Sequence, residues 1–144
     1  METRLYPRPG PFPGLDSTYV AEWNGPFLGL DFTLKLNNKH TVFAEIEYHW
    51  ADYYAKADWN LRSDFAHPKS FEHVSDGTGL VISTGCTTSF NNNWTMNIKF
   101  DYQDWSADYG IDRTFFADGT IGVTRLNEVN WKSNAIMIEF AYHF

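Results

Sequence analysis

Residues 135–144, AIMIEFAYHF, end the chain with a regular alternation of side-chain character. Every second residue from Ile136 to Phe144 is apolar or aromatic, whereas Glu139 and His143 lie among the residues between. Because successive side chains of a strand point to opposite faces, this pattern predicts a β-strand with one apolar face that ends in aromatics. A half-buried strand of a soluble sheet gives the same alternation, so the other strands must decide which medium the apolar face meets.

The same alternation recurs along most of the chain and predicts five long strands. The expected strands cover residues 18–36, 40–58, 79–90, 94–108 and 128–144. The tripeptide NGP at 24–26 indicates a bulge or bend inside the first of them, because proline cannot donate to a sheet ladder.

The connections between these strands are expected to alternate in length. Short asparagine-rich turns follow at 37–38 and 91–93, whereas longer polar loops are expected at 59–78 and 109–126. Short turns at one end and long loops at the other are typical of bacterial outer-membrane barrels. Residues 1–16 hold most of the prolines and are expected to form a separate loop segment, which leaves 17–144 for the barrel strands.

The composition favours a membrane β-barrel over the other classes of membrane protein. Aromatic residues make up 18% of the chain, yet the mean hydropathy is −0.42. No apolar run approaches the roughly 18 residues that a membrane-spanning helix needs. A barrel keeps its hydropathy low because half of each strand faces a polar interior. The net charge of −7 gives no basic footprint for nucleic acid.

The polar faces of the expected strands carry ionisable groups of both signs, which suits the lumen of a barrel. This predicted lumen network consists of Asp31, Lys35, Glu45, Glu47, His49, Lys99, Asp101, Glu139 and His143. The opposite faces carry no charge over the same length, as contact with lipid demands. Aromatics near both strand ends, such as Trp94 and Trp50, match the two interfacial girdles of such barrels.

The membrane reading implies particular partners. We expect outer-membrane lipid around the apolar faces, and we expect Phe140, Tyr142 and Phe144 to resemble the C-terminal signal that the barrel-assembly machinery reads. The N-terminal METRLYPRPGPFPGL lacks the apolar segment of a signal peptide, so an exported form is expected to be longer. Five strands leave two open edges, which a missing N-terminal half or a second copy would have to cover.

The order of segments resembles the second half of the omptin family and of the related Protochlamydia-type outer-membrane proteins. The resemblance rests on STYVAEWNGPFLGLDFTLKL, GLVISTGCTTSFNNNWTMNIKFDYQDW and RLNEVNWKSNAIMIEFAYHF. It implies an antiparallel up-and-down transmembrane β-barrel of ten strands in the outer membrane, of which this chain would supply the last five. It also implies either a structural or surface role or an aspartyl endopeptidase.

The catalytic pattern of the omptins transfers only in part. The resemblance places an Asp-x-His pair near residues 58–60, where this sequence reads Asp58-Trp59-Asn60, with asparagine in the histidine position. The nearest candidate catalytic residues are Asp58, Asp64, His67 and His73, at other spacings.

Other chemistry finds little support in the pattern. The five histidines have no spacing typical of zinc, and no cofactor motif is found. Cys86 is the only cysteine, which excludes an intrachain disulfide. A soluble β-barrel that binds an apolar ligand remains a third functional alternative.

Overall fold

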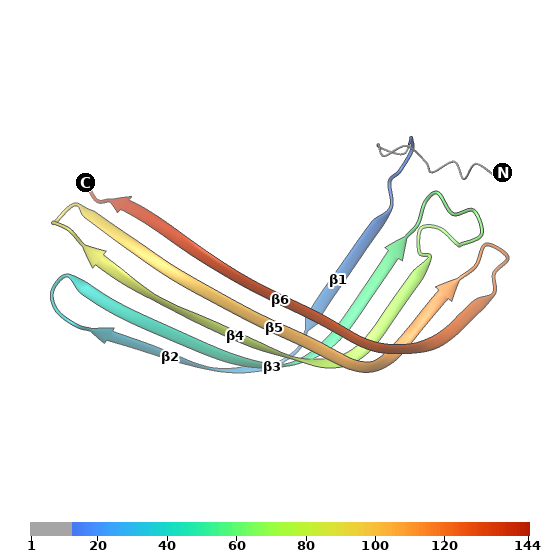
Figure 1. The fold of residues 1–144 in the computed structure, drawn as a ribbon, viewed down its shortest axis with the longest axis horizontal. Helices are drawn as coiled ribbons and strands as arrows, with labels where there is room; N and C mark the ends of the chain where they lie inside the picture. The colour runs from blue at the N-terminus through green and yellow to red at the C-terminus, as the bar shows by residue number, and fades with distance from the viewer. Residues whose placement is uncertain (1–12) are drawn as a thin grey trace, which may run out of the picture.

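The computed structural model describes residues 13–144 as a single antiparallel β-sheet that curls into half a barrel (Figure 1). The strands are β1 (Thr18–Asn24), β2 (Phe27–Lys35), β3 (His40–Asp58), β4 (Phe71–Ser89), β5 (Trp94–Phe115) and β6 (Ile121–Tyr142). Their order across the sheet is β1-β3-β4-β5-β6, and β2 also pairs with β3. The all-β antiparallel class is therefore confirmed, while most of the predicted loop segment at residues 1–16 lies outside the described residues.

β1 and β2 form one strand with a bend, as the NGP tripeptide predicts. Asn24 pairs with Asp52 and Phe27 pairs with His49, so the register on β3 is the same on both sides of the bend. No residue is inserted, and the feature is therefore not a bulge. The carbonyl oxygen of Pro26 accepts a hydrogen bond of 3.0 Å from the Trp50 N–H, which keeps the ladder closed. The sheet is thus five positions wide although it has six strands.

The strands reach further than their apolar alternation predicts. β4 begins at Phe71 inside the expected loop 59–78, and the expected loop 109–126 is a hairpin whose turn lies between Phe115 and Ile121. The prediction of a long loop at 109–126 was therefore wrong, and the loop after β3 is shorter than predicted. In these extensions, which lie at the loop end, both faces carry polar side chains. The alternation that marks the strands near the short turns is therefore absent from them.

A β-bulge lies where the sheet bends most sharply. Between Val74 and Gly77 of β4 the register with β5 shifts, and the extra residue lies on β5, where Tyr109 has a φ of 52°. Because one inserted residue moves the following side chains to the opposite face, Asp112 shares the concave face with Trp105 in spite of the odd separation between them.

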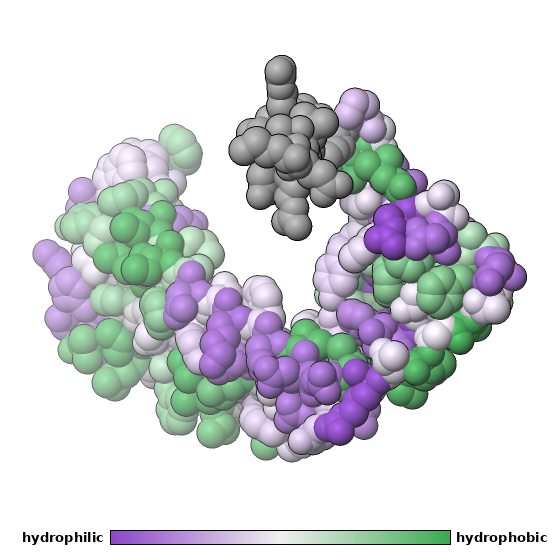
Figure 2. All heavy atoms as spheres, turned by 45° about the vertical axis from the view of Figure 1, so that its right-hand side comes forward, coloured by the Kyte–Doolittle hydropathy of each residue, from purple (hydrophilic) through white to green (hydrophobic). Residues whose placement is uncertain are grey.

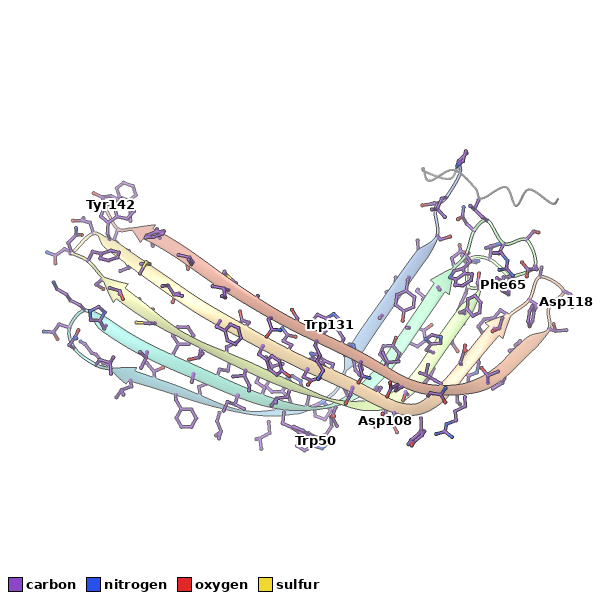
Figure 3. The ribbon with its side chains drawn as sticks, in the orientation of Figure 1. Trp50, Phe65, Asp108, Asp118, Trp131 and Tyr142 are labelled. Carbon is purple, nitrogen blue, oxygen red and sulfur yellow. The ribbon has the colours of Figure 1, made fainter. Side chains whose placement is uncertain are left out.

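The two faces of the sheet differ in packing. The small core lies on the concave face, where Tyr53, Ala55 and Ala107 are buried against Trp23, Leu126 and Val129. Large apolar side chains remain exposed on the convex face (Figure 2). Trp50 and Trp131 project from opposite faces of the sheet (Figure 3). Within residues 13–144, no helix is long and apolar enough to cross a membrane.

Candidate functional site

A largely apolar surface without charged side chains covers the convex face between the short turns and the middle of the sheet; we call it the apolar band. Strand pairing aligns the side chains of the band in rows across the sheet. In one such row Leu30 pairs with Ile46, Ile46 with Ile82, and Ile82 with Tyr102. Exposed members of the band include Leu28, Leu30, Phe32, Leu34, Leu36, Ile46, Tyr48, Trp50, Ile98, Phe100, Ile136, Ile138 and Phe140. Their exposed fractions run from 39% for Phe100 to 73% for Ile136.

The height of the apolar band matches a lipid bilayer. On β5 it covers about nine residues, from Trp94 to Tyr102, within the roughly 9–11 residues of a tilted membrane-spanning strand. Aromatic pairs lie at both borders. Trp94 packs on Tyr142 at the turn end with a centroid distance of 5.0 Å, and Tyr48 meets Trp50 edge-on at the same distance toward the loops.

On β5 and β6, charged side chains follow the apolar band on the convex face toward the loop end. Lys132 forms an ion pair of 2.8 Å with Asp104, and the hydroxyl of Tyr102 donates a hydrogen bond of 2.9 Å to the same carboxylate. Near the loops, Arg113 contacts Glu72 at 2.7 Å. The convex face therefore divides into an apolar half and a charged half. A surface in contact with hydrocarbon would require such a division, since charges without protein partners are costly there.

The predicted lumen residues lie on the concave face at the level of the apolar band. Glu47 pairs with His49 at 2.9 Å, and Lys99 pairs with Asp101 at 2.8 Å. Ser83 donates a hydrogen bond to Asp101, and the Thr95 hydroxyl lies 3.3 Å from Nε2 of His143. The remaining members, Asp31, Lys35, Glu45 and Glu139, lie on the same face by register, level with residues of this network.

A layer of aromatic side chains crosses the concave face above these charges. Trp23 packs on Tyr53 with a centroid distance of 4.6 Å and on Trp105 at 5.6 Å. His49 joins the layer from below, 4.9 Å from both Phe27 and Trp105. Sequence reasoning missed this layer, although the alternation of Ala51, Tyr53, Ala55 and Ala57 gives a signal for a buried face.

Two of the candidate catalytic residues come together. Nδ1 of His67 lies 2.5 Å from Oδ1 of Asp58, and both side chains are partly exposed at the loop end. Asp64 instead binds Arg62 through two hydrogen bonds of 2.8 and 2.7 Å, which hold the pKa of Asp64 below its ordinary value. Asp64 is therefore separate from the histidine that the sequence places nearest to it.

The fourth candidate, His73, faces a pocket on the concave face of the sheet. Its Nε2 lies 3.5 Å from Oδ1 of Asp112, an oxygen that is buried and has no hydrogen-bond partner among residues 13–144. The other carboxylate oxygen of Asp112 accepts a hydrogen bond of 3.2 Å from Thr124. A pocket of about 250 Å³, lined by Tyr19, Trp59 and Phe71, adjoins this pair. Sequence analysis missed Asp112 because it fell inside an expected loop.

No group of three histidine, cysteine or carboxylate side chains within residues 13–144 could hold a metal ion. Cys86 lies half-buried on the convex face.

A comparison with protein families places the chain. The model of the Protochlamydia outer membrane protein family, Pom, matches residues 3–144. The chain belongs to this family. Membership of the Pom family indicates the outer membrane as the cellular location. No curated protein and no solved structure matches the chain.

The C-terminal residues of this Pom chain are arranged as a row on the convex face. Phe140 and Tyr142 are exposed, and Phe144 packs edge-on against Tyr142 with a centroid distance of 5.0 Å. The role of these aromatics as an assembly signal stays a prediction.

Proposed function

We propose that this chain forms one wall of a transmembrane β-barrel in the outer membrane of a Gram-negative bacterium. The apolar band lies in the hydrocarbon, the concave face lines a polar interior, and the loop end faces the outside. The observation that carries this proposal is the height of the band, about nine residues, with charges directly above it and aromatics at its borders.

The proposal extends to an omptin-like architecture and to a dependence on the barrel-assembly machinery, which the exposed C-terminal row of Phe140, Tyr142 and Phe144 favours. Ten strands, of which this chain supplies the last five, give an interior filled by side chains instead of an open pore. The network of Glu47, His49, Lys99 and Asp101, with the aromatic layer above it, supplies such a filling. In this architecture the role of the chain is structural or surface-related.

A charge placed in the middle of the apolar band tests the proposal. Ile98→Lys puts an ammonium group at the bilayer midplane and is expected to cost roughly 2–4 kcal/mol of insertion free energy. Its neighbour Asn97 points to the concave face, so Asn97→Lys is the matched control and should change insertion little. Partition of the full chain between water and lipid vesicles, followed by sedimentation, measures both variants.

Equal losses for Ile98→Lys and Asn97→Lys would contradict the membrane proposal, because they would show that the two faces meet the same medium. The soluble alternative requires the leucine and isoleucine rows to pack inside a closed barrel. In the half-barrel those rows lie on the exposed convex face, which counts against it.

A second candidate function is peptide hydrolysis, and the Asp58–His67 pair is the observation that favours it. A carboxylate that orients a histidine lets the other ring nitrogen take a proton from water, which activates it as a nucleophile. Hydrolysis of basic peptides by the membrane-embedded protein, lost in His67→Ala and kept in His40→Ala, would support this candidate. His40 is a suitable control because it lies at the turn end beside Thr88. If the unmodified protein does not hydrolyse these peptides, peptide hydrolysis is excluded as a function.

A further inference from the structure

The two edges of the sheet run in the same direction. β1 and β2 begin at the loop end of the molecule and finish at the short turns, and β6 does the same (Figure 1). This follows from an antiparallel sheet that is five positions wide, since an odd number of alternating strands begins and ends with the same direction.

Both edges are incomplete inside a membrane. An edge strand presents a row of unpaired N–H and C=O groups, and lipid offers them no partner. Lumenal charges repeat the pattern. Four lumenal charges have no ion-pair partner within residues 13–144, and three of them lie on edge strands: Asp31 and Lys35 on β2 and Glu139 on β6, with Glu45 on the inner strand β3 as the fourth. Lys99 and Asp101 on the inner strand β5 pair with each other. The edges thus lack both backbone and side-chain partners.

We propose that the partner that completes this sheet is an amphipathic β-segment with an odd number of strands, and not a second copy of this chain. This inference rests on the proposed membrane function. Both edge strands of the partner must run from the turn end to the loop end, so that both new seams are antiparallel. The partner presents apolar side chains outward. On its lumenal face it brings cationic groups to Asp31 and Glu139 and an anionic group to Lys35.

A second copy of the chain cannot complete the sheet, because its strands or its charged half would have the wrong direction. Rotated about the barrel axis, it brings strands of the same direction together and makes two parallel seams, whereas bacterial single-chain barrels are antiparallel throughout with an even number of strands. Turned upside down, it restores antiparallel seams but points its charged convex half, with Asp104 and Lys132, to the opposite side of the membrane. Assembly from one side of the membrane delivers all copies in one orientation.

The number of strands added to the chain provides the test. A copy of residues 40–115, placed ahead of the full chain, supplies β3, β4 and β5, which start at the turn end and finish at the loop end. A copy of residues 71–115 is the matched control, because it has the same junction but supplies only two strands. Both proteins and the unextended full chain are reconstituted in lipid vesicles. Closure is measured by heat-modifiable mobility in gels and by resistance to protease.

The three-strand extension is expected to give a heat-modifiable, protease-resistant monomer, and the two-strand extension and the unextended chain are expected to give neither property. A closed dimer of the unextended chain, or equal closure of both extensions, would overturn the inference while leaving the membrane proposal intact. Entry of all three proteins into vesicles without closure of the three-strand form would also overturn it. Failure of all three to enter vesicles would overturn the proposed function, and the inference with it.

Discussion

Ser70 is a small side chain on which the loop end depends. It is fully buried, its Oγ donates to the carbonyl of Ala66 at 3.0 Å, and the same Oγ accepts from the N–H of Trp59 at 3.0 Å. Its backbone carbonyl also accepts a hydrogen bond of 2.8 Å from the N–H of Phe115. Ser70 therefore ties the loop after β3 to the hairpin between β5 and β6.

Replacement of Ser70 by alanine should loosen this loop. The N–H of Trp59 loses its acceptor in a part-buried hydrogen bond, and the loss of one such bond costs about 0.5–1.5 kcal/mol. Hydrogen exchange at the Trp59 amide should accelerate accordingly. Ser63 lies exposed in the same loop, and Ser63→Ala is the control, expected to leave exchange unchanged. Similar exchange in both variants would show that the Ser70 bonds do not hold the loop.

Glu72 gives the loop end a dependence on pH. Hydrogen bonds from Lys69, and then from Arg113 and Tyr54, hold the pKa of Glu72 below its ordinary value of 4.5. A carboxyl group with a lowered folded pKa contributes stability in full above its unfolded pKa, and this contribution is lost as pH falls through the folded pKa. We therefore expect hydrogen exchange at the loop amides to accelerate as pH falls below about 4.5, after correction for intrinsic rates.

The Glu72→Gln variant supplies the comparison for this titration, because glutamine cannot ionise. It should show the faster exchange at neutral pH and little further change on acidification. A full acid response in Glu72→Gln would assign the pH dependence to other carboxyl groups.

At the scale of elements, the bulge on β5 decides which residues share a face near the loops. Gly110 follows the bulged Tyr109, and a Cβ at this glycine would lie 2.3 Å from the carbonyl oxygen of Val74. The backbones approach so closely that only glycine fits without movement of the neighbouring strand.

Gly110→Ala should therefore destabilise the upper sheet by about 1–3 kcal/mol, the usual cost of overpacking. Gly122 on β6 is the matched control, since a Cβ there would meet its nearest neighbour at an ordinary 3.4 Å. Urea titration of the vesicle-bound chain, followed by the fluorescence of its tryptophans, measures both variants. A Gly110→Ala protein as stable as Gly122→Ala would show that the strands separate at this point without cost.

The elements were predictable where one face is apolar and the other polar. β2 and the parts of β3, β5 and β6 nearest the short turns satisfy that condition. The polar residues of the predicted lumen followed from the same alternation. Toward the loop end, β3 keeps its alternation because Tyr53 and Ala55 are buried, whereas the ends of β4, β5 and β6 carry polar side chains on both faces and were expected to be loops. The Asp58–His67 contact was not predictable either, because it depends on the path of the loop between them and not on strand spacing.

For the whole molecule, the central claim is that the apolar band touches hydrocarbon. A bilayer around the part of the sheet nearest the short turns accounts for the exposed apolar side chains of the band and for the aromatic pairs at its borders. It also requires a partner for the two open edges of the sheet. It also separates the molecule into an embedded half with the lumenal charges and a projecting half with the His73–Asp112 pocket and the Asp58–His67 pair.

A spin-label scan along β5 from Trp94 to Asp108, in a Cys86→Ser background in lipid vesicles, tests this claim most directly. Each label is compared for its accessibility to oxygen, which concentrates in lipid, and to a water-soluble nickel reagent. The account predicts that even-numbered positions from 94 to 102 favour oxygen, that odd-numbered positions do not, and that the contrast ends at Asp104. Equal access of the nickel reagent to even and odd positions of that segment would contradict it.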